Sequence, residues 1–193
     1  TDPYKAAFAL GARTADGIFV IKGRNKSKLK KTAAEMIEYS KITGLSEEIL
    51  KLADELQMLI DQDKWKELEV TLDKYKQDVV FSLYEVGEFD IFILLQLGGW
   101  VEGLNRTAYL IYNNYDVEKA ALINELGILN QLIYNVQKMP NKELLSEPYI
   151  VESLKQLNAI KSVLISENKE DYTLEQIQEI IDASASIKKA FMN

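Results

Sequence analysis

The stretch LQLGGWVEGLNRTAYLI, residues 95–111, decides the fold, because it reads as the middle of a long apolar helix. It nevertheless contains three glycines, one glutamate and one arginine. Each interior glycine costs about 0.5–1 kcal/mol relative to alanine, and a buried charge needs a partner. We therefore expect an enclosed helix with close neighbours, whose charges pair with each other or with a ligand.

The composition of the chain removes several classes of chemistry. Its 193 residues include no cysteine and no histidine, which excludes thiol catalysis, Ser-His-Asp triads and zinc sites built on thiolate or imidazole. Any metal site would need oxygen ligands alone, and we expect no metal and no cofactor. The net charge of −7 argues against nucleic-acid binding, which requires a basic face.

Apolar spacing and capping residues predict an all-α fold of eight helices in a single domain, residues 1–193. The predicted helices cover about 3–22, 27–43, 46–60, 65–86, 88–113, 116–138, 146–165 and 173–192, and a polar link covers 166–172. Short connections favour antiparallel neighbours, and an open solenoid of helix pairs is the alternative. No segment has the length and apolar character of a membrane span.

Short matches along the chain suggest an internal repeat of a four-helix unit, residues 1–87 and 88–193. ADGI at 15–18 resembles VEGL at 101–104, and SEEIL at 46–50 resembles SEPYI at 146–150. The alternative is that amphipathic helices resemble each other by chance.

Small residues form a stripe on each of two predicted helices, because residues four apart share a helix face. The stripes are Ala7, Gly11 and Ala15 on the first helix, and Gly99, Gly103 and Thr107 on the fifth. Such stripes fit either close helix–helix packing or room for a ligand beside the backbone.

The same two helices carry two of the three arginines, each with an acid three or four residues away. The spacings of Arg13 with Asp16 and of Glu102 with Arg106 allow an ion pair along each helix. If the two helices face each other, all four groups meet at the centre of the molecule. The candidate ligand-binding residues are then Arg13, Asp16, Gly99, Trp100, Glu102, Gly103 and Arg106.

Several interpretations of this central cluster stay open. It is a closed salt-bridge network, a site for a small polar or anionic ligand, an oxygen-ligand cation site, or a hydrolase centre that uses Asp16 and Glu102. A further alternative is a carrier that holds an apolar molecule between the two halves. The absence of nucleophile, metal-ligand and phosphate-loop patterns favours non-enzymatic binding of a partner or small ligand.

Two side-chain groups flank these features. Aromatic residues near the cluster are expected to pack in the core or line its edge: Trp100, Tyr109, Tyr112 and Tyr115. One basic cluster is expected to be solvated or to contact an anionic membrane or acidic partner: Lys22, Arg24, Lys26, Lys28, Lys30 and Lys31.

LGARTADGIF (10–19) and LGGWVEGLNRTAYL (97–110) together resemble a family of secreted bacterial proteins, well represented in Bacteroidetes-type genomes, that has no assigned activity. The GGWxEGL segment is intact, whereas Gly17 stands where a leucine is expected and Asn105 where an aromatic often follows. The resemblance implies an all-helical, exported protein, often a lipoprotein. The chain starts at Thr1 without methionine, so we expect that a signal peptide or part of an expressed sequence was removed.

Overall fold

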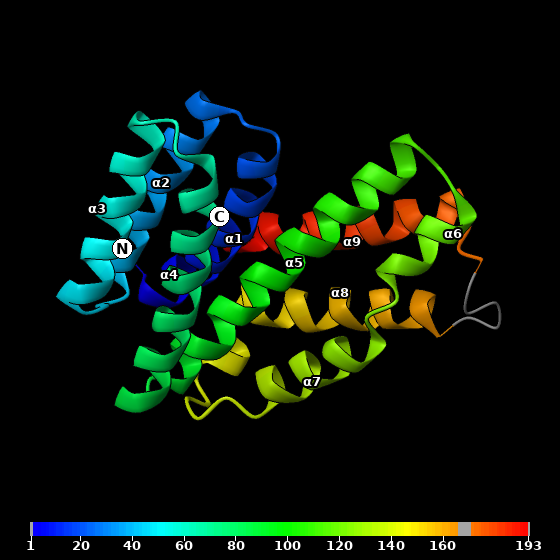
Figure 1. Cartoon of the computed structure of the whole chain (residues 1–193). Coiled ribbons are helices and arrows are strands. Elements are labelled where there is room, and N and C mark those ends of the chain that lie inside the picture. The colour runs from blue at the N-terminus through cyan, green and yellow to red at the C-terminus, as the bar shows by residue number, and fades with distance from the viewer. Residues whose placement is uncertain (1, 166–170, 193) are drawn as a thin grey trace. The chain divides into compact units, whose positions relative to one another are not determined.

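The computed structural model describes residues 2–165 and 171–192 of the chain, and within these ranges the protein is all-α, as predicted (Figure 1). Its helices form two compact units, Thr1–Trp100 and Val101–Asn193. Helix α5 (Phe89–Asn113) runs through the boundary, so its two halves belong to different units.

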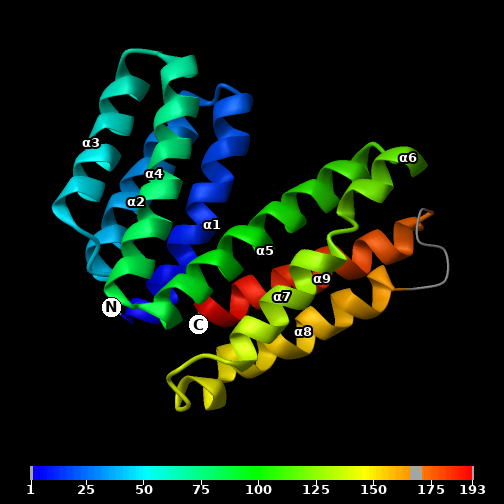
Figure 2. The same cartoon turned by 60° about the horizontal axis from the view of Figure 1, so that its bottom comes forward.

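The first unit contains four helices joined by short turns, α1 (Pro3–Lys22), α2 (Lys26–Ile42), α3 (Glu47–Asp61) and α4 (Trp65–Val86), and the first half of α5. In this group α1 packs on α2, α2 on α3 and α3 on α4, and α1 also contacts α4 (Figure 2). Local signals set their ends. The Asp2 carboxylate accepts a hydrogen bond from the Tyr4 amide at 2.8 Å and caps α1, and Gly87 ends α4 with a φ of 76°.

The apolar seam predicted on residues 65–86 forms the core face of α4. Five of its six members are buried: Leu68, Leu72, Tyr75, Val79 and Leu83. The sixth, Trp65, is half-buried. The helical spacing therefore located this face correctly.

Within the first unit, α1 and α5 approach so closely that their backbones touch. A Cβ atom added to Gly11 would lie closer than 3.0 Å to the carbonyl oxygen of Leu95, and one added to Gly98 equally close to that of Phe8. Close contact at glycine was predicted, and Gly99 takes part in it, because a Cβ atom on Gly11 would lie 2.9 Å from the Gly99 nitrogen; the tightest approach on α5, however, is at Gly98, which the predicted stripe did not include. A Cβ on Gly99 would meet the Gly11 oxygen at an ordinary 3.5 Å, and one on Gly103 would meet nothing within 4 Å.

The second unit contains the other half of α5, α6 (Val117–Ala120), α7 (Leu126–Gln137), α8 (Pro148–Leu164) and α9 (Leu174–Met192). Its most extensive helix pairing is between α8 and α9. Thr173 and Gln176 form a reciprocal cap at the start of α9, since each backbone N–H donates to the other's side chain. Of the predicted polar link, residues 166–170 lie outside the described ranges.

Two predicted features of this unit are wrong. A single helix over 116–138 was expected, but α6 continues into a 3-10 turn (Ala121–Ile123) and α7 begins only at Leu126. Asn124 is a weak helix former, and the break allows Ile123 and Leu129 to be buried at once. The helix predicted from residue 146 begins at Pro148, because Ser146 belongs to a second 3-10 turn (Leu144–Ser146).

The repeat of residues 1–87 and 88–193 is not confirmed. Four helices of 15–22 residues precede α5, whereas two 3-10 turns and the four-residue α6 interrupt the part that follows it. The repeat therefore stays a prediction. None of the helices in the described ranges is long and apolar enough to cross a membrane.

Candidate functional site

The seven predicted site residues are divided between the two units. Arg13, Asp16, Gly99 and Trp100 belong to the first unit, and Glu102, Gly103 and Arg106 belong to the second. The prediction that these residues meet at one centre concerns a contact between the two units, and it stays a prediction.

In the first unit, the charges of α1 are paired with α2. Asp16 is only 2% exposed, and Lys28 Nζ donates to its Oδ1 at 3.3 Å. Arg13 forms an ion pair with Glu35. The expected pair between Arg13 and Asp16 is therefore replaced by two pairs to α2, the helix on which α1 packs most extensively. Lys28 and Glu35 lie two turns apart, which places them on the same face of α2.

In the second unit, Glu102 is 1% exposed and lies between two cations. Arg106 Nε donates to its Oε1 at 2.7 Å, which confirms the pair expected from the spacing. Lys188 Nζ of α9 lies 2.5 Å from its Oε2. Sequence reasoning missed Lys188, because nothing in the chain distinguishes it from the other lysines.

Asn105 extends this contact into a polar seam between α5 and α9. Its side-chain amide donates to Ser184 Oγ at 2.8 Å and to the Ile181 carbonyl oxygen at 3.3 Å, and its Oδ1 accepts from Lys188 at 3.3 Å. The asparagine thus occupies a structural position where the resemblance led us to expect an aromatic. A tight helix pair with a polar seam requires every member to have a partner, which these contacts supply.

The burial of the two acids bears on the chemistry that they can perform. Acid–base hydrolysis needs two carboxyl groups in a cleft that water and substrate can enter. Asp16 and Glu102 are enclosed, and each has an ion-pair partner in its own unit. The contacts within each unit therefore pair both acids, whereas the hydrolase interpretation, which needs the two carboxyl groups in one cleft, stays a prediction.

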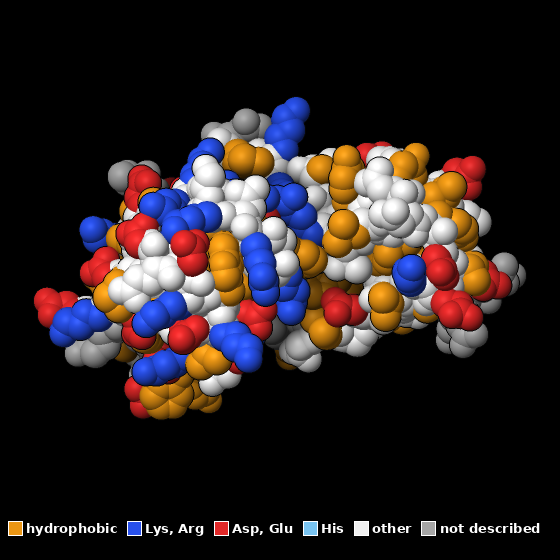
Figure 3. Space-filling view, turned by 45° about the horizontal axis from the view of Figure 1, so that its top comes forward, with side chains coloured by type: hydrophobic (Ala, Val, Ile, Leu, Met, Phe, Trp, Pro, Cys, Tyr) orange, Lys and Arg blue, Asp and Glu red, His pale blue; other side chains and the backbone are white. Residues whose placement is uncertain are grey.

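The basic cluster is largely neutralised by nearby acids. Lys26 Nζ lies 2.9 Å from Asp63, Lys30 Nζ lies 2.5 Å from Asp61, and the hydrogen bond from Lys30 holds the pKa of Asp61 below its usual value. Three more pairs join Lys22 to Glu69, Lys28 to Asp16 and Lys31 to Glu35. Figure 3 shows basic and acidic side chains intermixed over this unit. The cluster is therefore a set of ion pairs rather than a uniformly positive surface.

The tyrosines of α5 and the following turn are not core residues, so of the two expected positions only the edge of the cluster stays a prediction. Tyr109, Tyr112 and Tyr115 are 58%, 39% and 44% exposed, and Trp100 is half-buried. The Tyr115 hydroxyl donates to the carbonyl oxygen of Tyr172 at 3.0 Å, so part of its polar edge is used within the unit.

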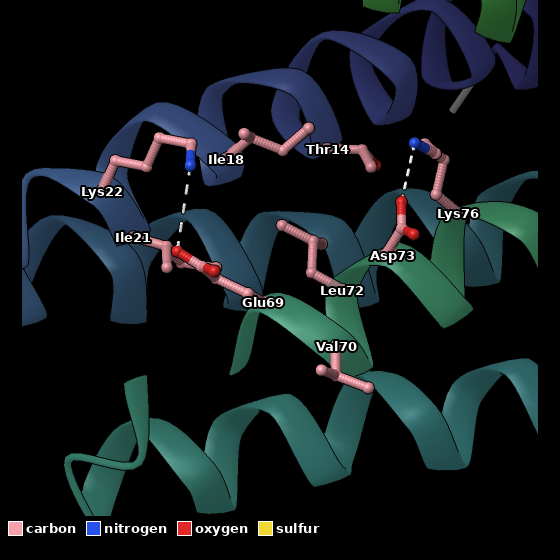
Figure 4. Close-up of a pocket in the computed structure, with 9 residues that line it drawn as sticks. All are labelled: Thr14, Ile18, Ile21, Lys22, Glu69, Val70, Leu72, Asp73 and Lys76. Atoms are coloured by element: carbon pink, nitrogen blue, oxygen red, sulfur yellow. Dashed lines mark ion pairs between the residues drawn. The ribbon is translucent and has the colours of Figure 1, made fainter. Parts of the chain in front are cut away.

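The first unit also has an open groove of about 310 Å³ between α1 and α4, which the sequence did not indicate (Figure 4). Its lining residues are Thr14, Ile18, Ile21 and Lys22 of α1, and Glu69, Val70, Leu72, Asp73 and Lys76 of α4. Ile21 and Leu72 are buried at its floor, whereas Ile18 and Val70 are 38% and 71% exposed. The aliphatic side chains make the middle of the groove apolar.

The two ends of this α1/α4 groove are polar. At one end, Lys22 of α1 and Glu69 of α4 approach to 4.0 Å, and at the other Lys76 Nζ lies 2.9 Å from Asp73 (Figure 4). All four side chains are about half exposed or more. Exposed pairs of this kind contribute little to stability, so they exchange partners at small cost.

Neither metal chemistry nor a known relative defines the site further. Among the residues that the structure describes, no three acidic side chains gather in a way that could hold a metal ion. Comparisons with protein-family models, with curated proteins and with solved structures found no match. The resemblance noted in the sequence therefore stays a prediction.

Proposed function

We propose that the protein is a non-enzymatic binding protein that holds a small amphiphilic molecule in the α1/α4 groove. The observation that carries this proposal is the groove itself, in which an aliphatic floor lies between two charged ends. Its volume of about 310 Å³ is at the lower end of the range for small-molecule sites.

The groove suggests the chemistry of its ligand. From Thr14 to Lys22, α1 advances about 12 Å, which sets the length of a ligand that reaches both ends. The middle of such a ligand is apolar, because it lies against Ile18, Ile21 and Leu72. Its ends carry charged or polar groups that replace one partner in the pairs Lys22–Glu69 and Asp73–Lys76.

The buried charges then have a structural role in this proposal. Asp16 and Arg13 fasten α1, which forms one wall of the groove, to α2. Breaking a buried ion pair is costly, so such contacts keep the helices in one register. Fixed helices preserve the shape of the groove, which reduces the cost of binding.

Export of the protein is part of the proposal, and it rests on the resemblance of residues 10–19 and 97–110 alone. Fractionation of the cells that produce it, with an antibody against the protein, tests this point. Recovery with cytoplasmic enzymes would contradict export and would leave the groove proposal intact.

The groove is tested with 8-anilinonaphthalene-1-sulfonate, an apolar dye that carries one anionic group. We expect saturable fluorescence enhancement with one dominant site. Ile18→Asp places a charge in the apolar middle and should weaken binding by about fivefold or more, equivalent to about 1 kcal/mol. The matched control is Val151→Asp on α8, which also replaces an exposed aliphatic residue. Equal dye binding by the Ile18 variant and the wild type would refute the groove as the site.

A further inference from the structure

Three aromatic side chains at the end of α4 and the start of α5 form an exposed surface that the groove does not include. We call Phe81, Tyr84 and Phe89 the aromatic corner; they are 61%, 63% and 43% exposed. The Tyr84 and Phe89 rings meet edge to face, with centroids 5.9 Å apart and planes at 82°. Exposed aromatic groups of this kind mark interaction surfaces more often than they serve folding.

The backbone holds this corner in a fixed shape. Phe81 and Tyr84 are three residues apart and share a face of α4. The chain then reverses at Gly87, whose N–H donates to the Tyr84 carbonyl oxygen at 3.2 Å, while the Glu88 N–H donates to that of Leu83 at 3.1 Å. The turn places Phe89 against Tyr84. Rings fixed in this way lose little conformational entropy when a partner binds.

Along the chain, the charged residues next to the corner have one sign. Residues 77–105 include no lysine and no arginine. Glu85 lies one turn after Phe81 on the same helix face, and Glu88 immediately precedes Phe89; both glutamates are exposed. The surface therefore combines apolar rings with negative charge, unlike the groove, whose ends carry both signs.

We propose that the aromatic corner docks a basic amphipathic segment of a partner protein. Leucine-like side chains of the segment cover the rings, and its lysines or arginines pair with Glu85 and Glu88 or stack on the aromatic faces. An anionic membrane does not fit, because the same glutamates repel it. A second copy of the chain fits poorly, because a symmetric contact would place acid against acid.

A peptide of known chemistry tests this surface. The probe is a fluorescently labelled helix of about 14 residues, with leucine on one face and lysine on the other. Anisotropy should show saturable binding that weakens as salt is raised. A peptide with glutamate in place of lysine should not bind. Phe81→Ser combined with Tyr84→Ser should weaken binding by about tenfold or more.

The charge variants separate a docking site from general attraction to an acidic protein. Glu85→Lys with Glu88→Lys should weaken binding by about tenfold, whereas Glu38→Lys with Glu55→Lys, an equal charge change at exposed residues of α2 and α3, should weaken it less than about twofold. Equal effects of the two pairs would overturn the proposal, as would full binding by the Phe81→Ser/Tyr84→Ser variant. Circular dichroism of each variant confirms that it is folded.

Two further measurements address the other occupants. Sedimentation that reveals a dimer lost in Phe81→Ser would assign the corner to a second copy and overturn the proposal. Flotation with phosphatidylglycerol vesicles, if lost in the same variant, would assign it to a membrane and overturn it likewise. A monomer that does not float and that binds the lysine peptide through the corner supports it. None of these outcomes depends on the dye site, so the two proposals fail independently.

Discussion

In the first unit, α5 presents bare backbone to α1, whereas in the second unit the same helix presents charged and amide side chains to α9. Gly98 touches the backbone at Phe8 without any side chain between them. Glu102 and Asn105, one turn and two turns further on, reach Lys188 and Ser184. Two modes of helix packing therefore follow each other within about 10 Å of one helix.

The two regions of α5 differ in the interaction that stabilises the helix contact. At the glycines the contact depends on shape, since dispersion and close packing act only where no side chain separates the helices. At the polar seam it depends on partnership, since a buried carboxylate without its cations would be strongly unfavourable. Adding a side-chain atom at the glycine contact is therefore expected to destabilise the protein. At the polar seam, the destabilising change is the removal of a charged partner.

The largest effect is expected from Gly98→Ala. Its new Cβ atom would overlap the Phe8 carbonyl oxygen, and a backbone atom cannot rotate away, so α1 and α5 must separate. We expect a loss of about 3 kcal/mol in the free energy of unfolding. Urea unfolding followed by circular dichroism measures it. Gly11→Ala should behave in the same way, because its Cβ atom meets the Leu95 backbone.

Two other glycines of α5 provide graded controls for this substitution. Gly99→Ala makes an ordinary contact at 3.5 Å and should change stability by less than about 1 kcal/mol. Gly103→Ala meets no atom within 4 Å and should raise stability by about 0.5–1 kcal/mol, because alanine favours the helix. If Gly98→Ala were as stable as Gly99→Ala, the contact would not depend on shape.

The second effect concerns the polar seam. Glu102→Gln leaves Lys188 and Arg106 without their carboxylate and should cost about 2 kcal/mol. This is less than for a fully buried pair, because the two cations are 24% and 38% exposed and keep part of their hydration. Glu179→Gln, at an exposed position of α9, is the control and should stay within about 0.5 kcal/mol.

A double-mutant cycle with Lys188→Met isolates the pair across the seam. We expect a coupling energy of about 1 kcal/mol between Glu102 and Lys188. Strictly additive losses would mean that the carboxylate is held by its own helix, through Arg106, and that the seam does not depend on partnership.

The sequence predicted features within single helices more reliably than contacts between helices. The spans of α1 and α5, the seam of α4 and the Glu102–Arg106 pair all follow from helical periodicity, which acts within one helix. The partners Glu35, Lys28 and Lys188 lie on other helices, and an unaligned sequence does not indicate which lysine or glutamate lies opposite.

The same reasoning explains why Gly98 was missed and Gly99 and Gly103 were preferred. Spacing by four selects a face of the helix, but the neighbour decides which face is in contact, and Gly98 lies about 100° around the axis from Gly99. The α1/α4 groove was also out of reach, because it depends on how two helices 50 residues apart pack together. The groove and its charged ends could therefore be found only from the structure, whereas the burial-prone charges of α1 and α5 were indicated by the sequence.

The last prediction concerns a buried hydrogen bond between two uncharged side chains, Ser40 and Tyr75, whose loss should have a small effect on the free energy of unfolding near neutral pH. Ser40 Oγ donates its hydrogen to the Met36 carbonyl oxygen at 2.6 Å, so the Tyr75 hydroxyl must donate to Ser40 at 2.5 Å. Tyr75→Phe removes this one hydrogen bond, leaves Ser40 with its other partner, and should cost about 1 kcal/mol at pH 8. Burial raises the pKa of Tyr75 to about 12, above its ordinary value near 10.

Because of this pKa shift, the difference in unfolding free energy between the wild type and the Tyr75→Phe variant changes sign with pH. Above pH 10 the unfolded tyrosine loses its proton first, so the wild type loses about 1.4 kcal/mol per pH unit until about pH 12, and the phenylalanine variant does not share that loss. The two unfolding free energies should therefore cross near pH 11, which urea titrations from pH 8 to 11.5 would measure. If the unfolding free energies of the wild type and the variant changed with pH in parallel, the Tyr75 hydroxyl would ionise equally in the folded and unfolded states. The hydroxyl would then be less enclosed than Glu102 in the polar seam of the second unit.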